Sequence, residues 1–321
     1  MRLTQRSQAI IDRTDSSDIH AVKFILQTSI RIIALTILYF GCFVVISGAL
    51  LSVPQQTTTV QANAVLFALL VVGLINTAVL AYITLRSHWA GWKLMLTIFV
   101  LFYGVVTVMS QIESAFFITR LPPGMLSRLF LAGAIMAAVF APLVVLILGK
   151  GKSPSREAVG QSRLQMTAGS WAIKLSVIVV AYVLIYFTFG YYIAWRNAAV
   201  RSYYSGIDPG SFVGQITSVL RDRPTLFPLQ VVRALMWTAL AVPVIKMMKG
   251  AWWEAGLAVA LLFGVLMNTQ LFLPNPFMPH EVRMAHLLET APSNFLFGWL
   301  VVLVLLAGTS ELALSKTRSM K

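Results

Sequence analysis

The residues of this chain most able to do chemistry are ionisable side chains inside long apolar segments. Glu113 lies in the segment VMSQIESAFFI, two residues after Gln111, and Arg233 lies inside another apolar segment. Arg233 is about eight residues, or roughly 12 Å of helix rise, from the end of its segment. An ionisable group in hydrocarbon is costly, so it usually faces a partner or a water-filled cavity. We therefore expect Glu113 and Arg233 to lie at similar depth and to pair.

A second group of polar residues lies within and just before one segment in the C-terminal part of the chain. If Pro279 opens a short helix, Arg283, His286 and Glu289 step by three along one face, and residues 292–294 end that helix before the next apolar segment. The sequence predicts one polar site built from both groups, unless Glu113 and Arg233 pair only structurally and the histidines are simply solvated. The complete candidate set is Gln111, Glu113, Arg233, Asn268, Gln270, His280, Glu281, Arg283, His286, Glu289 and Asn294.

The spacing of histidine and carboxylate residues limits the metal chemistry that this site offers. His280-Glu281 matches the start of the H-E-x-x-H metalloprotease motif, but the next histidine is six residues on, about 240° round a helix. One continuous helix cannot present both histidines to one metal. His286 and Glu289, with Glu113 as a third ligand, remain the metal candidates, and such nitrogen and oxygen donors suit zinc, manganese or iron. The sequence does not identify a cofactor.

Other motifs of catalysis are missing from the sequence. It contains no G-x-S-x-G nucleophile elbow, no P-loop and no G-x-G-x-x-G turn. The single cysteine, Cys42, excludes a disulfide within the chain and a cysteine-rich zinc site.

The elements that must position these side chains are apolar segments of membrane-spanning length. Of the 321 residues 58% are hydrophobic and 11% charged, and the mean hydropathy is +0.80. A span needs ~20 apolar residues for a hydrocarbon core of ~30 Å, and a transmembrane strand would alternate apolar with polar residues. The sequence thus predicts an all-α, polytopic membrane protein with about eight transmembrane helices, at 32–51, 62–85, 94–112, 129–148, 175–195, 225–245, 255–273 and 292–310.

The distribution of basic residues predicts the orientation of these spans. The net charge is +14, and most basic residues fall in segments 1–31, 149–170 and 316–321 or at span ends on the same side, whereas segment 52–61 has no charge. Basic residues are enriched on the cytoplasmic side of membrane proteins. We expect a multi-pass protein of the cytoplasmic membrane with both termini in the cytoplasm. Its partners would be anionic lipid headgroups on that face, not nucleic acid.

A polar linker divides the chain into two membrane halves. Segment 149–170 separates residues 32–148 from residues 171–315, and each half contains four predicted spans. Four spans per half give both halves the same orientation, as in parallel repeats. A short internal match supports this arrangement, since Leu121-Pro122 and Met278-Pro279 each precede the last span of a half. Outer-face interfacial helices are expected near 208–222, starting at Asp208-Pro209, and near 279–290.

Three functions are compatible with these features. The favoured one is transport or binding of a small anionic or zwitterionic solute, with Arg233 as counter-charge and with Glu113 and His286 coupling protons. The second is a membrane-embedded enzyme, with or without a metal, that acts on a lipid-linked substrate and uses Glu113 or Glu289 as general acid or base. The third is an accessory membrane subunit without chemistry of its own.

Overall fold

The fold was analysed in a computed structural model that describes residues 2–51, 59–118, 121–152, 164–204, 206–275 and 277–308. Side chains of the first two helices are described from residues 22 and 62 onward. All regular elements of the described residues are helical, and eight segments are long and apolar enough to cross a membrane. The predicted class, a polytopic helical membrane protein with eight spans, is confirmed.

Several spans are built from more than one helical element. Five spans lie within single helices, namely Val22–Leu50 in α1 (Arg2–Leu50), Ala62–Arg86 in α2 (Thr59–Arg86), α5 (Met125–Ile147), α9 (Leu226–Met247) and α11 (His280–Leu306). The third span, Gly91–Phe117, consists of α3 (Gly91–Phe102), η1 (Tyr103–Val108) and α4 (Met109–Phe117), and the fifth, Ala168–Ala194, consists of α6 (Ala168–Phe189) and η3 (Gly190–Ala194). The seventh, Trp252–Phe272, consists of α10 (Trp252–Ala260), η4 (Leu261–Leu266) and η5 (Asn268–Phe272). Two short helices, α7 (Ala198–Tyr203) and α8 (Phe212–Asp222), lie between the fifth and sixth spans.

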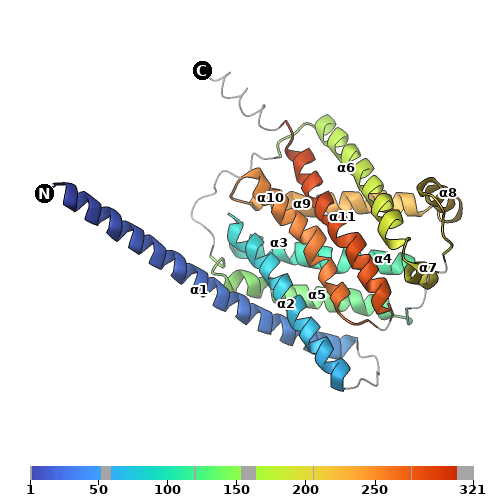
Figure 1. Ribbon diagram of the computed structural model, residues 1–321, viewed down its shortest axis with the longest axis horizontal. Helices are drawn as coiled ribbons and strands as arrows, with labels where there is room; N and C mark the ends of the chain where they lie inside the picture. The colour runs from blue at the N-terminus through green and yellow to red at the C-terminus, as the bar shows by residue number, and fades with distance from the viewer. Residues whose placement is uncertain are drawn as a thin grey trace.

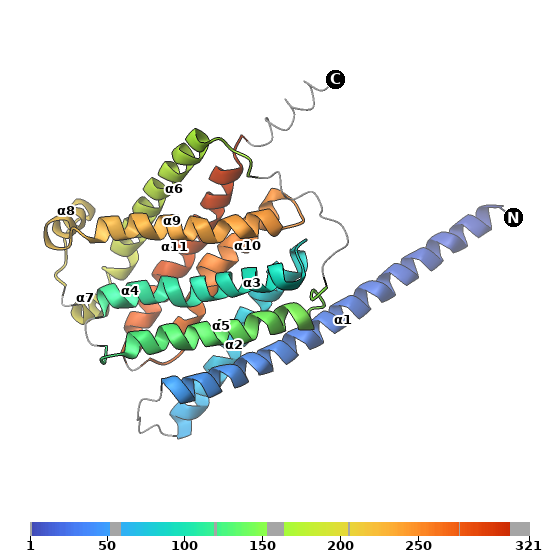
Figure 2. The same ribbon diagram turned by 180° about the vertical axis from the view of Figure 1, so that it is seen from behind.

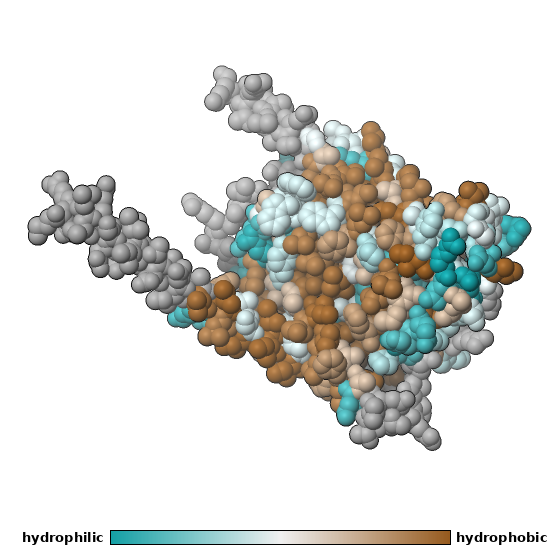
Figure 3. Space-filling model, viewed as in Figure 1, coloured by the Kyte–Doolittle hydropathy of each residue, from teal (hydrophilic) through white to brown (hydrophobic). Residues whose placement is uncertain are grey.

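The spans alternate in direction, so the bundle has two ends. We call the end where α11 finishes the inner end, because the charge pattern predicts it to be cytoplasmic, and the opposite end, with α7 and α8, the outer end. Figures 1 and 2 show α1 continuing far beyond the bundle at the inner end. Apolar residues cover the middle of the face seen in Figure 3, and hydrophilic ones gather toward its margins. This surface is the one that a bilayer requires.

The two halves of the chain pack by the same scheme. In the first half α1 packs on α2 and α5, and α3 packs on α5; in the second half α6 packs on α9 and α11, and α10 packs on α11. The rings of Tyr39 and Phe140 meet in the first half at 5.2 Å between centroids, and those of Tyr182 and Phe297 meet in the second at 4.7 Å. That the two halves are parallel repeats of one four-span unit stays a prediction.

Three loop segments pair at the inner end. The backbone N–H of His88 donates to the carbonyl of Met247 (2.8 Å), and that of Lys249 donates to the carbonyl of Arg86 (2.9 Å). Ser87 and Met248 thereby form an antiparallel bridge. Arg86 forms an ion pair with Glu254, and the Lys150 Nζ donates to the Ser87 carbonyl at 2.7 Å. We call these residues, 86–88, 247–249, Lys150 and Glu254, the inner clasp.

A π-helical turn interrupts the third span of each half. η1 ends just before the segment that carries Gln111 and Glu113, and η4 ends just before Asn268 and Gln270. A π turn leaves carbonyl groups without their usual helical donor, and such turns are frequent at functional sites. The Asn268 Nδ2 donates to the Gly264 carbonyl at 2.9 Å and so supplies a donor to η4.

α1 is one continuous helix from Arg2 to Leu50, and the boundary between a cytoplasmic segment 1–31 and the first span stays a prediction. The structure corrects one expected helix start. The outer helix begins at Phe212, not at Asp208-Pro209. The Asp208 side chain accepts from Gly210 N in a turn, and the Ser211 Oγ caps the helix by accepting from Gly214 N.

The expected break at residues 292–294 is also wrong. α11 runs without interruption from His280 to Leu306, so no separate helix exists at 279–290. Pro292 removes the N–H that would donate to the Leu288 carbonyl, and α11 continues past it while packed against α10 and η4. Most of the linker 149–170, all of the tail 316–321 and most of loop 52–61 lie outside the described residues.

Candidate functional site

A cavity of about 570 Å³ lies in the outer half of the bundle. Its walls come from both halves of the chain, mainly α4 with parts of α1 and α5 on one side and α6, η5 and α11 on the other, and α9 contributes Arg233. His280 and Glu281, at the exposed start of α11, do not line it. The remaining sequence candidates do, namely Gln111, Glu113, Arg233, Asn268, Gln270, Arg283, His286, Glu289 and Asn294.

The predicted ion pair joins the two halves across this cavity. The Glu113 Oε1 contacts the Arg233 Nη1, which also donates to the Gln230 Oε1 at 3.1 Å. The Arg233 guanidinium lies 6.0 Å from the centre of the Tyr182 ring. The Arg233 side chain is 2% exposed, whereas that of Glu113 is 28% exposed. The pairing is confirmed, and the acid is the member that faces the cavity.

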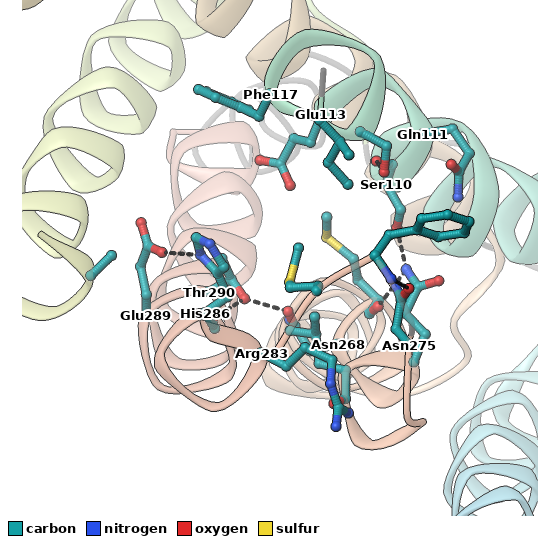
Figure 4. A pocket seen from close by; sticks show the side chains of 18 of the residues that line it. Ser110, Gln111, Glu113, Phe117, Asn268, Asn275, Arg283, His286, Glu289 and Thr290 are labelled. Atoms are coloured by element: carbon teal, nitrogen blue, oxygen red, sulfur yellow. Dashed lines mark hydrogen bonds and ion pairs between the residues drawn. The ribbon is translucent and has the colours of Figure 1, made fainter. Parts of the chain in front are cut away.

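A histidine forms a second polar group on another wall. The His286 Nδ1 lies 2.8 Å from the Glu289 Oε2, and its Nε2 lies 3.0 Å from the Tyr204 hydroxyl. Since the carboxylate accepts, the neutral ring carries its proton on Nδ1, and Nε2 accepts from the phenol. Burial raises the pKa of Tyr204 above its usual range, so this phenol stays a donor. Figure 4 shows Glu113 across the cavity from His286 and Glu289.

Amide and hydroxyl side chains form a third group, in which one hydrogen bond joins the two halves and another joins two spans of the second half. The Gln270 Nε2 donates to the Ser110 Oγ at 2.5 Å, and the Thr290 hydroxyl donates to the Asn268 Oδ1 at 2.5 Å. The Gln111 Oε1 is buried and has no hydrogen-bond partner among the described residues. Asn268 and Gln270 are thus satisfied within the protein, and Gln111 has an acceptor to offer.

Two further candidate residues line the cavity, but their contacts are structural. The Arg283 Nη1 donates to the carbonyls of Leu271 (2.7 Å) and Leu273 (2.6 Å), at the end of η5. Those carbonyls have no helical donor, so Arg283 closes that helix end. The Asn294 Nδ2 contacts the Met267 Sδ at 3.4 Å.

The candidate metal ligands do not assemble. Among the described residues no group of three or more His, Cys, Asp or Glu side chains is placed to hold a metal ion. Glu113 binds Arg233, and both ring nitrogens of His286 are engaged by Glu289 and Tyr204. The expectation of a shared metal at His286, Glu289 and Glu113 is therefore wrong.

Several residues that build or support the cavity were missed by the sequence analysis. Gln230 does not line the cavity but binds Arg233 from one helical turn before it, and a second polar residue on that face of an apolar span was a usable signal. Tyr182 and Tyr186 carry polar hydroxyl groups in the fifth span. Tyr204 gave no signal, because nothing in the sequence placed α7 over the start of α11.

Comparisons of the chain with protein-family models, with curated proteins and with solved structures found no match. The functional argument therefore depends on the chemistry of the cavity. That chemistry comprises a buried cation paired with a carboxylate, a second buried arginine held by backbone carbonyls, and an imidazole held between a carboxylate and a phenol.

Proposed function

We propose that this integral membrane protein is a transporter that binds a small anionic or zwitterionic solute in the outer cavity. The observation that carries the proposal is the meeting of Glu113, Arg233, His286 and Glu289 in one cavity of about 570 Å³. That volume lies in the range of small-molecule sites, which have mostly apolar walls and a few convergent polar groups.

The position of the cavity between two halves supports transport. Glu113 of the first half pairs with Arg233 of the second, and Ser110 bonds Gln270 in the same way. At the opposite end the inner clasp holds the halves together. Many transporters work by rocking one half against the other around a fixed site. A cavity at the outer end and closed contacts at the inner end fit the outward-facing state of such a cycle.

A duplicated polar arrangement supports the idea of two parallel repeats. The Asn76 Nδ2 in the second span donates to the Tyr39 hydroxyl in the first (2.9 Å), and its Oδ1 accepts from Thr269 in the seventh (2.8 Å). In the other half, Arg233 in the sixth span lies by Tyr182 in the fifth and binds Glu113 in the third. On this proposal one copy of the arrangement is charged and the other is neutral.

The orientation remains the one that the charge pattern favours. Arg86, Lys150, Lys174 and Lys249 lie at the inner end, which we propose faces the cytoplasm and its anionic lipids. The protein would then reside in the cytoplasmic membrane with its cavity open to the outside.

Cysteine labelling tests this arrangement, because the chain has one native cysteine to remove. In a Cys42→Ala background, Ser114→Cys lines the cavity and Ser176→Cys lies exposed on the lipid side of α6. A membrane-impermeant maleimide added outside should label Ser114→Cys in oriented vesicles, and should not label Ser176→Cys. Labelling of Ser114→Cys from the inside alone, or from neither side, would contradict an outward-facing cavity.

One observation favours the membrane-embedded enzyme as a second candidate. His286, held between Glu289 and Tyr204, has the geometry of a general acid–base residue. Phe43, Leu51 and Leu129 add apolar wall on which a lipid chain could lie. Recovery of chemically altered solute after incubation with purified protein would favour this candidate; recovery of unaltered solute would favour transport.

A further inference from the structure

We infer that Glu113 is an internal substitute for the carboxylate of the solute. A small monocarboxylate displaces Glu113 from Arg233, and Glu113 takes up one proton as it leaves. This inference rests on the proposed transport function and adds to it the class of solute and the means of proton coupling.

The ion pair has one fixed and one movable member. Arg233 is 2% exposed, is tied to Gln230 and lies against Tyr182, in the middle of a long helix. Glu113 is 28% exposed and belongs to α4, a nine-residue helix that follows the π turn η1 and ends at Phe117. A ligand that enters the cavity therefore meets the acid first and competes for a guanidinium that stays in place.

The charge balance requires a proton. Without ligand, the Arg233 cation and the Glu113 anion cancel. A carboxylate that takes the place of Glu113 on Arg233 leaves Glu113 with an uncompensated negative charge in a partly buried site, which is costly. When Glu113 binds a proton from the outer solution, one O–H bond forms, no other covalent bond changes, and the site is neutral again.

The groups that face Glu113 offer no alternative cation. Arg233 comes from α9 and is the cation whose carboxylate partner is exchanged, while Tyr182 and Tyr186 come from α6 and are uncharged phenols. His286 and Glu289 on α11 face each other, so a proton on His286 is already balanced by Glu289. Two other arginines line the cavity, but Arg283 is held by the Leu271 and Leu273 carbonyls and Arg223 is exposed after the end of α8. Tyr204, which follows α7, bonds His286.

The shape and charge of the site favour a monocarboxylate. A guanidinium binds a planar carboxylate through two parallel hydrogen bonds. One arginine balances one negative charge, which disfavours dianions such as sulfate. Phe117, Leu129 and Ile185 line the same cavity, so an apolar body attached to the carboxylate has a place to pack.

Calorimetry with simple carboxylates tests the inference. Acetate, lactate and benzoate are titrated into the purified protein in two buffers with different ionisation enthalpies, which together give the number of protons bound. We expect uptake of one proton per carboxylate, and an affinity that falls about tenfold per unit rise in pH wherever one full proton is taken up on binding. Benzamide, sulfate and phosphate should bind at least tenfold more weakly than benzoate.

Two variants separate Glu113 from a structural role. Glu113→Gln resembles the protonated acid, so it should bind benzoate more tightly than wild type at neutral pH and without proton uptake. The double variant Glu113→Gln/Arg233→Gln leaves no unpaired buried charge, and it should fold but lose carboxylate binding. A thermal unfolding midpoint equal to that of the wild type would show that each variant is folded.

Three results would overturn the inference: carboxylate binding without proton uptake in the wild type, loss of binding in Glu113→Gln, or no binding of any of the three carboxylates. If no carboxylate binds while the Ser114→Cys variant is still labelled from outside, the solute class is wrong and the transport function stands. If that labelling also fails, both proposals fall.

Discussion

At the scale of single residues, the cost of burying charge explains the strongest feature of the site. Arg233 is almost fully buried and depends on Glu113. Glu113→Ala should therefore destabilise the protein by about 3 kcal/mol, because it leaves a buried cation unpaired. Arg233→Ala should cost less, since Glu113 reaches the cavity. Thermal and denaturant unfolding in detergent should give a double variant that costs less than the sum of the two. Strict additivity would mean that the contact contributes nothing.

His286 is the second residue whose role can be separated by substitution. His286→Gln keeps size and polarity but removes the titration, so it should weaken benzoate binding at acidic pH, where the wild-type imidazolium balances Glu289, and leave it nearly unchanged at alkaline pH, where the imidazole is neutral. Tyr204→Phe is the matched control, because it removes the hydrogen bond to His286 Nε2 and keeps the imidazole. Equal binding by His286→Gln and wild type at every pH would return His286 to a structural role.

At the scale of elements, close helix packing holds the cavity wall in place. Gly298 of α11 lies against α10, and a Cβ at this position would come within 2.7 Å of Ala260 Cα and 2.8 Å of Ala260 N. Backbone cannot move aside, so Gly298→Ala should destabilise the protein by about 1–3 kcal/mol. Gly41→Ala is the control, since nothing lies within 4 Å of the added atom; it should be neutral or stabilise α1 by about 0.5–1 kcal/mol. Similar unfolding midpoints for the two variants would contradict this packing.

Lys150 of the inner clasp should make the stability of the folded protein depend on pH. Burial, with nearby Lys249, lowers the pKa of Lys150 to about 8, while an unfolded lysine titrates near 10.4. Between these values the unfolded chain holds more protons, so the contribution of Lys150 to folded-state stability rises with pH across that window. Unfolding midpoints from pH 7 to 10.5 should show this rise, and Lys150→Gln should remove it. Lys152→Gln, at an exposed lysine, should keep it; loss of the rise in both variants would assign it to general charge repulsion.

At the scale of the whole molecule, the predictable features are those set by the bilayer. Span number follows from hydrophobic length, and the pairing of Glu113 with Arg233 follows from the cost of intramembrane charge. The continuity of α11 through Pro292 could not be read from the chain, because it depends on packing against α10 and η4. The exclusion of His280 from the cavity follows from where that helix starts. Local sequence carries neither piece of information.

The rocking of two halves makes a last prediction about the inner clasp. Ser87 and Met248 form an antiparallel bridge, so their Cα atoms lie about 4.5–5.5 Å apart, within the range that a disulfide spans. In a Cys42→Ala background, oxidised Ser87→Cys/Met248→Cys should be locked with its inner end closed. It should bind benzoate as wild type does, because the cavity is at the other end, and proteoliposomes that contain it should not accumulate benzoate until a reductant is added. Each single cysteine variant controls for the substitutions. Accumulation at the wild-type rate by the oxidised double variant would mean that the inner clasp does not open during transport, and a rocking mechanism would then have to be abandoned.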